Sequence, residues 1–132
     1  MFAAADIIYA YTRADALADG VLVDVSVTAR EAGFKCPVAM TRAAWADCVE
    51  WTDATDQRKD VWQDEAGRLW DVLHMAMFAA RRGGNDSRVE FTLLRVPVEG
   101  RGNLPRETTL VMEIGPGDQG EMVITIMQPG ED

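Results

Sequence analysis

The sequence predicts an α+β fold in a single domain over residues 1–132, with a helical N-terminal half packed on a C-terminal antiparallel meander of three or more strands. Helix caps and helical spacing of apolar residues recur as far as residue 82. Beyond that point apolar and polar residues alternate in three separate runs, which is typical of half-buried strands. The 132 residues, 48% of them hydrophobic and 27% charged, are enough for a core that needs no metal or disulfide.

The first forty residues are predicted to hold two short helices and two extended segments. Threonine is a good helix N-cap, glycine commonly ends helices, and β-branched residues favour strands. In chain order the predicted elements are a helix over 13–18 between Thr12 and Gly20, a strand or extended segment over 21–27, a helix over 29–32 between Thr28 and Gly33, and an extended piece over 37–40.

A further helix is predicted to start after Thr41, which can cap it, and to run to about Trp51. Its apolar residues recur at a spacing that places them on one helix face. The polar stretch 52–64 that follows is interpreted as a loop or a frayed turn.

Apolar residues recur at helical spacing over 62–80, which predicts a long helix. Residues 64–67 include a glycine and alternatively form a hairpin turn, in which case the helix starts near Trp70. Under both interpretations residues 71–82 are helical, because the segment ends with two arginines that suit a helix C-terminus and with a Gly-Gly pair.

The last third of the chain is predicted to form strands over 88–98, 108–114 and 122–127. The segments 99–103 and 115–120 between them are rich in glycine and read as turns. A strand follows 115–120, whereas a phosphate-binding loop is followed by a helix, so this segment is interpreted as a hairpin loop. Strands joined in this way pair antiparallel, with the helices covering one face of the sheet.

Acidic residues outnumber basic ones by 22 to 13, which gives a formal net charge of −9. Nucleic acids and anionic membranes both attract positive surfaces, so we expect the protein to bind neither of them directly. The N-terminal residues lack the basic region of a signal peptide, and their apolar run is too short to span a membrane. These observations predict a cytoplasmic protein.

The two cysteines, Cys36 and Cys48, match no zinc or redox motif, and the chain has a single histidine. We expect two buried thiols in a reducing compartment, with a disulfide between them as the alternative. No catalytic set, metal site or cofactor is predicted.

The acidic residues fall into two blocks, one between Asp47 and Asp71 and the other from Glu107 onward. Such blocks form either a solvated face or a docking surface for a basic partner. The docking hypothesis assigns partner binding to residues in the first block, where carboxylates and a tryptophan lie close in the chain. These are Asp53, Asp56, Asp60, Asp64, Glu65 and Trp62.

Four tryptophans flank or lie within the first acidic block, namely Trp45, Trp51, Trp62 and Trp70. Core packing is expected for three of them, and one left exposed would make an interface anchor. His74 follows Asp71 by three residues on a predicted helix, where a packed or half-exposed structural histidine is expected. The alternative is a pocket in which His74, Asp71 and Arg68 bind or convert a small ligand.

Segments in three regions of the chain resemble a family of small acidic proteins of unknown function from bacterial plasmids, integrative elements and prophages. The segments are 13–25 and 28–34, 63–73, and 115–118 with 123–127. The resemblance implies an accessory gene of mobile DNA, a setting in which anti-restriction and anti-CRISPR inhibitors are frequent. It implies no catalytic residues.

These observations together predict a non-catalytic acidic binding protein that inhibits a host defence or nucleic-acid-processing complex. Its partner would be a basic surface of that complex. The alternative function is a small enzyme or small-ligand-binding protein with its pocket around His74.

Overall fold

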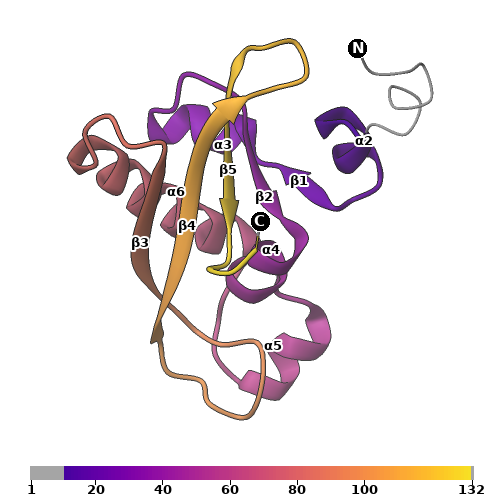
Figure 1. Cartoon of the computed structure of the whole chain (residues 1–132). Helices are drawn as coiled ribbons and strands as arrows, with labels where there is room; N and C mark the ends of the chain where they lie inside the picture. The colour runs from indigo at the N-terminus through magenta and orange to yellow at the C-terminus, as the bar shows by residue number, and fades with distance from the viewer. Residues whose placement is uncertain (1–10, 132) are drawn as a thin grey trace.

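The computed structural model describes residues 11–131, which form a five-stranded mixed sheet with helices packed against it (Figure 1). Across the sheet the strand order is β1 (Leu22–Asp24), β2 (Val38–Thr41), β5 (Met122–Met127), β4 (Arg106–Pro116) and β3 (Arg88–Arg95). Neighbouring strands pair antiparallel except β2 and β5, which are parallel. The predicted α+β class is confirmed, with the C-terminal meander β3–β4–β5 extended by two strands from the first half of the chain.

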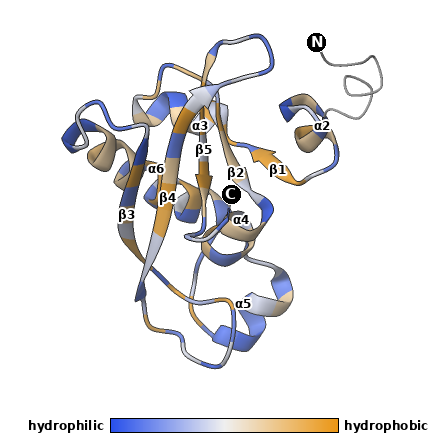
Figure 2. Ribbon diagram, in the orientation of Figure 1, coloured by the Kyte–Doolittle hydropathy of each residue, from blue (hydrophilic) through white to orange (hydrophobic). Residues whose placement is uncertain are grey.

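The helices dominate the first half of the chain. They are α2 (Arg13–Ala18), α3 (Ser26–Ala32), α4 (Arg42–Cys48), α5 (Asp53–Lys59) and α6 (Glu65–Arg82). α6, the longest of these, lies behind the sheet in Figure 1 and packs mainly on β3 and α3. Figure 2 shows the hydrophobic residues concentrated on the strands, whereas α5 is largely hydrophilic.

Side-chain caps begin four of these helices, because the first backbone N–H groups of a helix have no partner within it. Thr12, Thr41 and Thr52 each accept a hydrogen bond from the backbone N–H three residues later, and Asp64 does the same for α6. The caps at Thr12 and Thr41 were predicted from the sequence and are confirmed.

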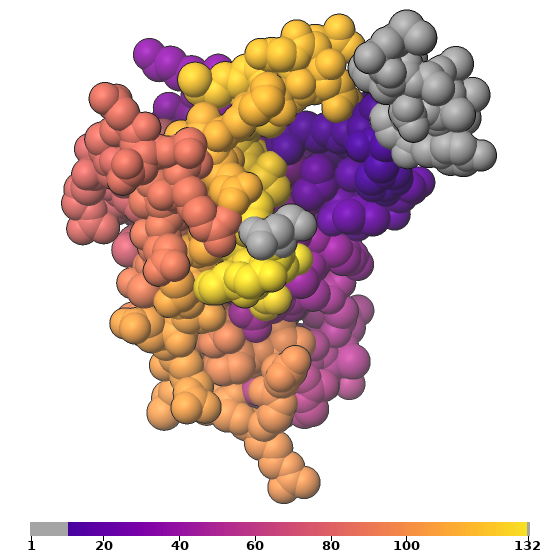
Figure 3. Space-filling model, viewed as in Figure 1, coloured from indigo at the N-terminus to yellow at the C-terminus, as the bar shows by residue number. Residues whose placement is uncertain are grey.

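The core lies between the sheet and α3, α4 and α6. Side chains alternate along a strand, so each strand gives every second residue to this layer. The strand residues of the core are Val38, Met40, Phe91, Leu93, Leu110, Met112, Ile124 and Ile126, all of them buried. The opposite face of the sheet is covered in part by the segment after β5, which crosses it in Figure 3. Glu131 fixes that segment by accepting a hydrogen bond from the Thr41 hydroxyl.

α2 is tied to the loop between β4 and β5. The Asp118 carboxylate accepts hydrogen bonds from the backbone N–H groups of Arg13 and Ala14, each at 2.9 Å. The Arg13 guanidinium in turn donates to the Thr125 hydroxyl and the Ile124 carbonyl of β5. The predicted hairpin loop 115–120 therefore joins two strands and also holds the first described helix.

Four of the predictions for residues 21–64 are wrong. The strand predicted over 21–27 stops at residue 24, because α3 begins at Ser26; Thr28 therefore lies inside that helix and does not cap it. The stretch 52–64, predicted as a loop, contains α5. The helix after Thr41 ends at Cys48, earlier than the predicted Trp51.

The long helix α6 starts at Glu65, with Asp64 as its cap. The helical interpretation of this region is therefore confirmed, and the hairpin turn over 64–67 is not formed. No helix within residues 11–131 is both long enough and apolar enough to cross a membrane. The prediction that the N-terminus carries no targeting segment concerns residues outside the described part of the chain.

Candidate functional site

A row of exposed aromatic side chains runs along the solvent side of α6. Trp70, His74 and Phe78 are spaced four residues apart, which places them on neighbouring turns of the helix. The Trp70 and His74 rings stack with centroids 5.7 Å apart, and the Phe78 ring meets His74 edge-on at 4.8 Å. Trp70 is 39% exposed and Phe78 is 46% exposed. His74 is thus an exposed member of an aromatic row, not a packed core residue.

Trp62 extends this row beyond the start of α6. It is 79% exposed, and it lines a shallow hollow together with Trp70, Gln63 and Asp64. The sequence predicted one exposed tryptophan, and the structure has two. Trp51 is buried and Trp45 is half-buried against the core, as expected for core tryptophans.

The carboxylates predicted to bind a partner lie around the junction of α5 and α6, and three of them have internal partners. Asp56 accepts a hydrogen bond from the Trp51 indole N–H at 3.1 Å, and Glu65 accepts one from the Trp51 backbone N–H at 3.0 Å. Asp64 caps α6. Asp53 and Asp60 are exposed, and their carboxylates make no hydrogen bond or ion pair with any described residue.

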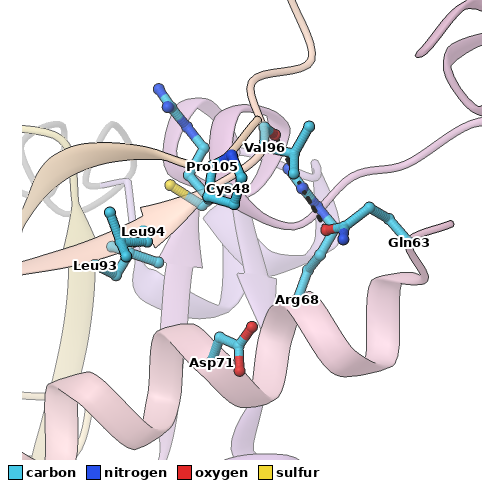
Figure 4. Close-up of a pocket in the computed structure, with 9 residues that line it drawn as sticks. Cys48, Gln63, Arg68, Asp71, Leu93, Leu94, Val96 and Pro105 are labelled. Atoms are coloured by element: carbon cyan, nitrogen blue, oxygen red, sulfur yellow. Dashed lines mark hydrogen bonds between the residues drawn. The ribbon is translucent and has the colours of Figure 1, made fainter. Parts of the chain in front are cut away.

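A hollow of about 170 Å³ lies beside Arg68, between α6 and the end of β3 (Figure 4). Arg68 is buried, and its guanidinium donates to the carbonyl oxygens of Asp47, Val49 and Val96. The group also stacks on the Trp51 ring at 4.8 Å. Burial lowers the pKa of Arg68 from its usual value. With these donors turned to carbonyls, Arg68 connects α6 to the end of α4 and to the segment after β3.

Cys48 and Arg95 line the same hollow. Burial, and next the Asp47 carboxylate, raises the pKa of the Cys48 thiol to about 12. Arg95 forms an ion pair with Asp47 at 3.0 Å, while its buried Nε atom has no hydrogen-bond partner among the described residues. Cys48 and Cys36 are both free thiols, so the alternative of a disulfide between them is not formed.

A second and larger hollow of about 370 Å³ adjoins the first one and is lined by Asp71 and His74 of α6. Their side chains share this hollow without forming a hydrogen bond or ion pair with each other. Glu107 of β4 lines the same hollow. The two acidic blocks of the sequence therefore meet here, at Asp71 and Glu107.

The exposure of Phe78 on α6 and of Leu94 on β3 was not predicted from the sequence. A signal for the aromatic row was present. The buried residues of α6 include Leu69, Leu73 and Ala76, and the aromatic row is offset by one position from the first two of them. Two apolar stripes on one helix exceed what a single core contact buries.

No group of three or more His, Cys, Asp or Glu side chains within residues 11–131 is placed to hold a metal ion. The described part of the chain is thus an α+β protein with an exposed aromatic and acidic surface along one helix. The chain belongs to a family of unknown function, DUF6573, whose model matches residues 1–132. Comparison with curated proteins gives no match, and comparison with solved structures gives none.

Proposed function

We propose that this chain is a non-catalytic binding protein that docks another protein on one surface. We call this docking surface the aromatic–acidic surface. It consists of four aromatic side chains and four carboxylates, namely Trp62, Trp70, His74 and Phe78 with Asp53, Asp60, Asp64 and Glu65. The observation that carries the proposal is the exposed aromatic row on α6. Large apolar groups gathered on a surface are typical of interaction sites, and tryptophan is enriched among the residues that contribute most to binding.

The partner is proposed to present a basic surface with apolar residues at its centre. The chain carries a formal net charge of −9, and the carboxylates Asp53 and Asp60, at the two ends of α5, are exposed and have no side-chain partner among the described residues. Charges of this kind raise the association rate and select the partner, and salt screens them over about 10 Å at 0.1 M. The aromatic side chains supply affinity that is less sensitive to salt.

A narrower form of the proposal concerns the identity of the partner. The excess of acidic residues and the resemblance to accessory proteins of mobile DNA support a partner that normally holds nucleic acid, such as a host defence or nucleic-acid-processing complex. The chain would then compete with DNA or RNA for the partner's basic surface without binding nucleic acid itself. Loss of that competition at high salt is the expected signature.

Site-specific photo-crosslinking of the full chain tests the proposal. A photoreactive phenylalanine analogue would replace Phe78 in one variant and Val27 in a matched control, because Val27 is an exposed apolar residue on a different helix. The expected result is a product with one basic protein from position 78 that is absent from position 27. The purified partner would then be measured against Trp62→Ala/Trp70→Ala, with Val27→Ala/Leu104→Ala as the control.

We expect the double tryptophan variant to bind at least about tenfold more weakly, since truncating a buried interface tryptophan commonly costs this much. The control variant removes two exposed apolar side chains outside the surface and should bind normally. Equal crosslinking from positions 78 and 27, or equal binding by the two double variants, would contradict the proposal.

A further inference from the structure

β3 is an edge strand, and the hydrogen-bonding pattern of the sheet shows which of its backbone groups face outward. Its register with β4 pairs Val89 with Met112 and Phe91 with Leu110. The Ile114 N–H donates to the Ser87 carbonyl, so these two residues form a hydrogen-bonded pair in the same register. Hydrogen-bonded and non-hydrogen-bonded pairs alternate in an antiparallel ladder. Glu90, Thr92 and Leu94 therefore point their N–H and C=O groups away from β4.

These outward groups are open to a further strand. No described residue makes a hydrogen bond to the backbone of Glu90, Thr92 or Leu94 outside the sheet ladder. An edge of this kind is a template for the addition of a strand from another chain. Leu94 on this edge is 64% exposed. A large exposed apolar side chain at an open edge favours association with another chain.

The hollow of about 370 Å³ that Asp71, His74 and Glu107 line lies at this edge of the sheet. Leu93 faces the helices as a core residue, whereas Thr92 and Leu94 belong to the opposite face of the strand by alternation. All three residues line the hollow, and Met75 and His74 of α6 line it as well. The hollow therefore reaches around the outer side of β3, where the side chains of an added strand would enter it.

The negative charge at the edge of β3 favours a basic segment as the added strand. Asp71 and Glu107 line the hollow, Glu90 lies on the strand itself, and none of these carboxylates makes a hydrogen bond or ion pair with a described residue. The cations of the strand are compensated, since Arg95 pairs with Asp47 and Arg88 pairs with Glu113. Arg106 lies opposite Arg95 in the register, and neither of them lines this hollow.

We propose that an extended basic segment of the partner protein adds to the free edge of β3 and inserts a lysine or arginine side chain into the hollow. The Met75 and Leu93 walls contact the aliphatic part of that side chain, and Asp71 and Glu107 bind its charged end. The inference rests on the proposed function and specifies the form in which the partner binds. A second copy of this chain is a poorer occupant, because it would bring a second set of these carboxylates to the edge.

Selection from a phage-displayed library of random 12-residue peptides on the full chain tests this inference. Enriched peptides would be synthesised and measured against Thr92→Pro and Glu107→Lys. Proline is tolerated at an edge position whose N–H faces outward, and Thr92 is such a position. Glu31→Lys is the matched control, since it makes the same charge change at an exposed carboxylate of α3 that has no hydrogen-bond or ion-pair partner among the described residues.

The expected peptides are basic, and their binding falls at least about tenfold with Thr92→Pro and with Glu107→Lys but not with Glu31→Lys. A second readout needs no variant. Bound peptide should slow hydrogen exchange at the amides of Glu90, Thr92 and Leu94 in the unmodified protein, because these N–H groups then gain a partner.

Three outcomes would overturn the inference. Peptides that bind Thr92→Pro normally and perturb Trp70 and Phe78 would place docking on the aromatic row, and the proposed function would stand without the edge. Enrichment of no basic peptide would remove the edge site, while the crosslinking experiment decides the proposed function separately. Protection of the same amides without peptide, together with a dimeric mass, would assign the edge to a second copy.

Discussion

Burial and a neighbouring carboxylate set the chemistry of Cys48. The thiol lies in the core next to Asp47, and its Sγ atom is 3.5 Å from an Asp47 oxygen. Both features disfavour a thiolate, so the folded protein keeps the thiol protonated at pH values well above the ordinary cysteine pKa of 9.0. A cysteine of this kind is a small apolar core residue and not a nucleophile.

Stability at alkaline pH should report this proton. The unfolded thiol loses its proton near the ordinary pKa of 9.0, while the folded thiol keeps it until about 12, so the free energy of unfolding falls as pH rises between these values. The slope from this group approaches about 1.4 kcal/mol per pH unit. Urea unfolding at pH 8, 9 and 10 should show a smaller fall for Cys48→Ala than for the unmodified protein. Parallel falls in the two proteins would contradict the prediction.

Single residues were predicted unevenly because sequence spacing does not give side-chain partners. The sequence did not indicate which tryptophan is exposed, and the assignment of Trp62, which is 79% exposed, to partner binding stays a prediction. Asp56 and Glu65 were chosen for their charge, yet both hold Trp51 in place. Only the three-dimensional position of Trp51 reveals that second role.

At the scale of elements, α5 fastens the long connection between β3 and β4. Lys59, at the end of α5, is 2% exposed and donates to the carbonyls of Glu99 and Gly102 at 2.8 and 2.5 Å. Arg58 donates to the Val98 carbonyl from the same helix turn. Burial lowers the pKa of the Lys59 ammonium, with the nearby Arg58 as the next cause.

Replacing Lys59 by methionine should release this connection. The two carbonyls lose their donor, so we expect amides over 98–103 to exchange hydrogen about tenfold faster while the strands stay protected. Lys35→Met is the matched control, because Lys35 is exposed and makes no hydrogen bond in the described chain. Unchanged exchange over 98–103 would show that the connection is held by other contacts.

Elements with strong periodicity were predicted, and those fixed by distant contacts were not. The three strands of the meander alternate clearly and were found with small errors at their ends. α5 was missed because it buries only Thr55 and Lys59, which gives no apolar pattern, although the Thr52 cap with acids first and bases last was a usable signal. The pairing of β2 with β5 joins residues more than eighty positions apart, which no local pattern predicts.

At the scale of the whole molecule, Asp118 connects the two ends of the described chain. Its carboxylate holds the first turn of α2 through two backbone N–H groups, and these bonds lower the pKa of Asp118. The Asp118 carboxylate therefore contributes its full stabilisation at pH values above its pKa in the unfolded chain, near 3.8. That stabilisation is lost as the pH falls through the lower pKa of Asp118 in the folded protein. The contact should therefore survive mild acid.

Asp118→Ala should detach α2 without unfolding the sheet. We expect amides over 13–18 to lose their protection from hydrogen exchange at neutral pH, while those of β4 and β5 keep it. Asp86→Ala is the matched control, since Asp86 is exposed in the turn after α6 and binds no backbone N–H with its side chain. Protection of α2 in the Asp118 variant would show that the remaining contacts of the helix, those of Arg13 and of β1, are enough to hold it.

The two acidic blocks illustrate what composition predicts at this scale. The excess of carboxylates was evident from the sequence, and the structure brings Asp71 and Glu107 from different blocks into one hollow. Their meeting depends on how α6 packs on β3 and on the β3–β4 register, and neither is encoded in local spacing.

The place of β5 in the sheet has a consequence for how the protein is made. β5 lies between β2 and β4, so residues 38–41 have no partner on that side until residues 122–127 leave the ribosome. During synthesis the apolar strand β2 stays unpaired on that side, next to its helices, until the intervening chain has been translated. A nascent chain of this kind is a natural client for chaperones that shield exposed apolar segments. The five-stranded sheet is complete only when its central strand, β5, has been made.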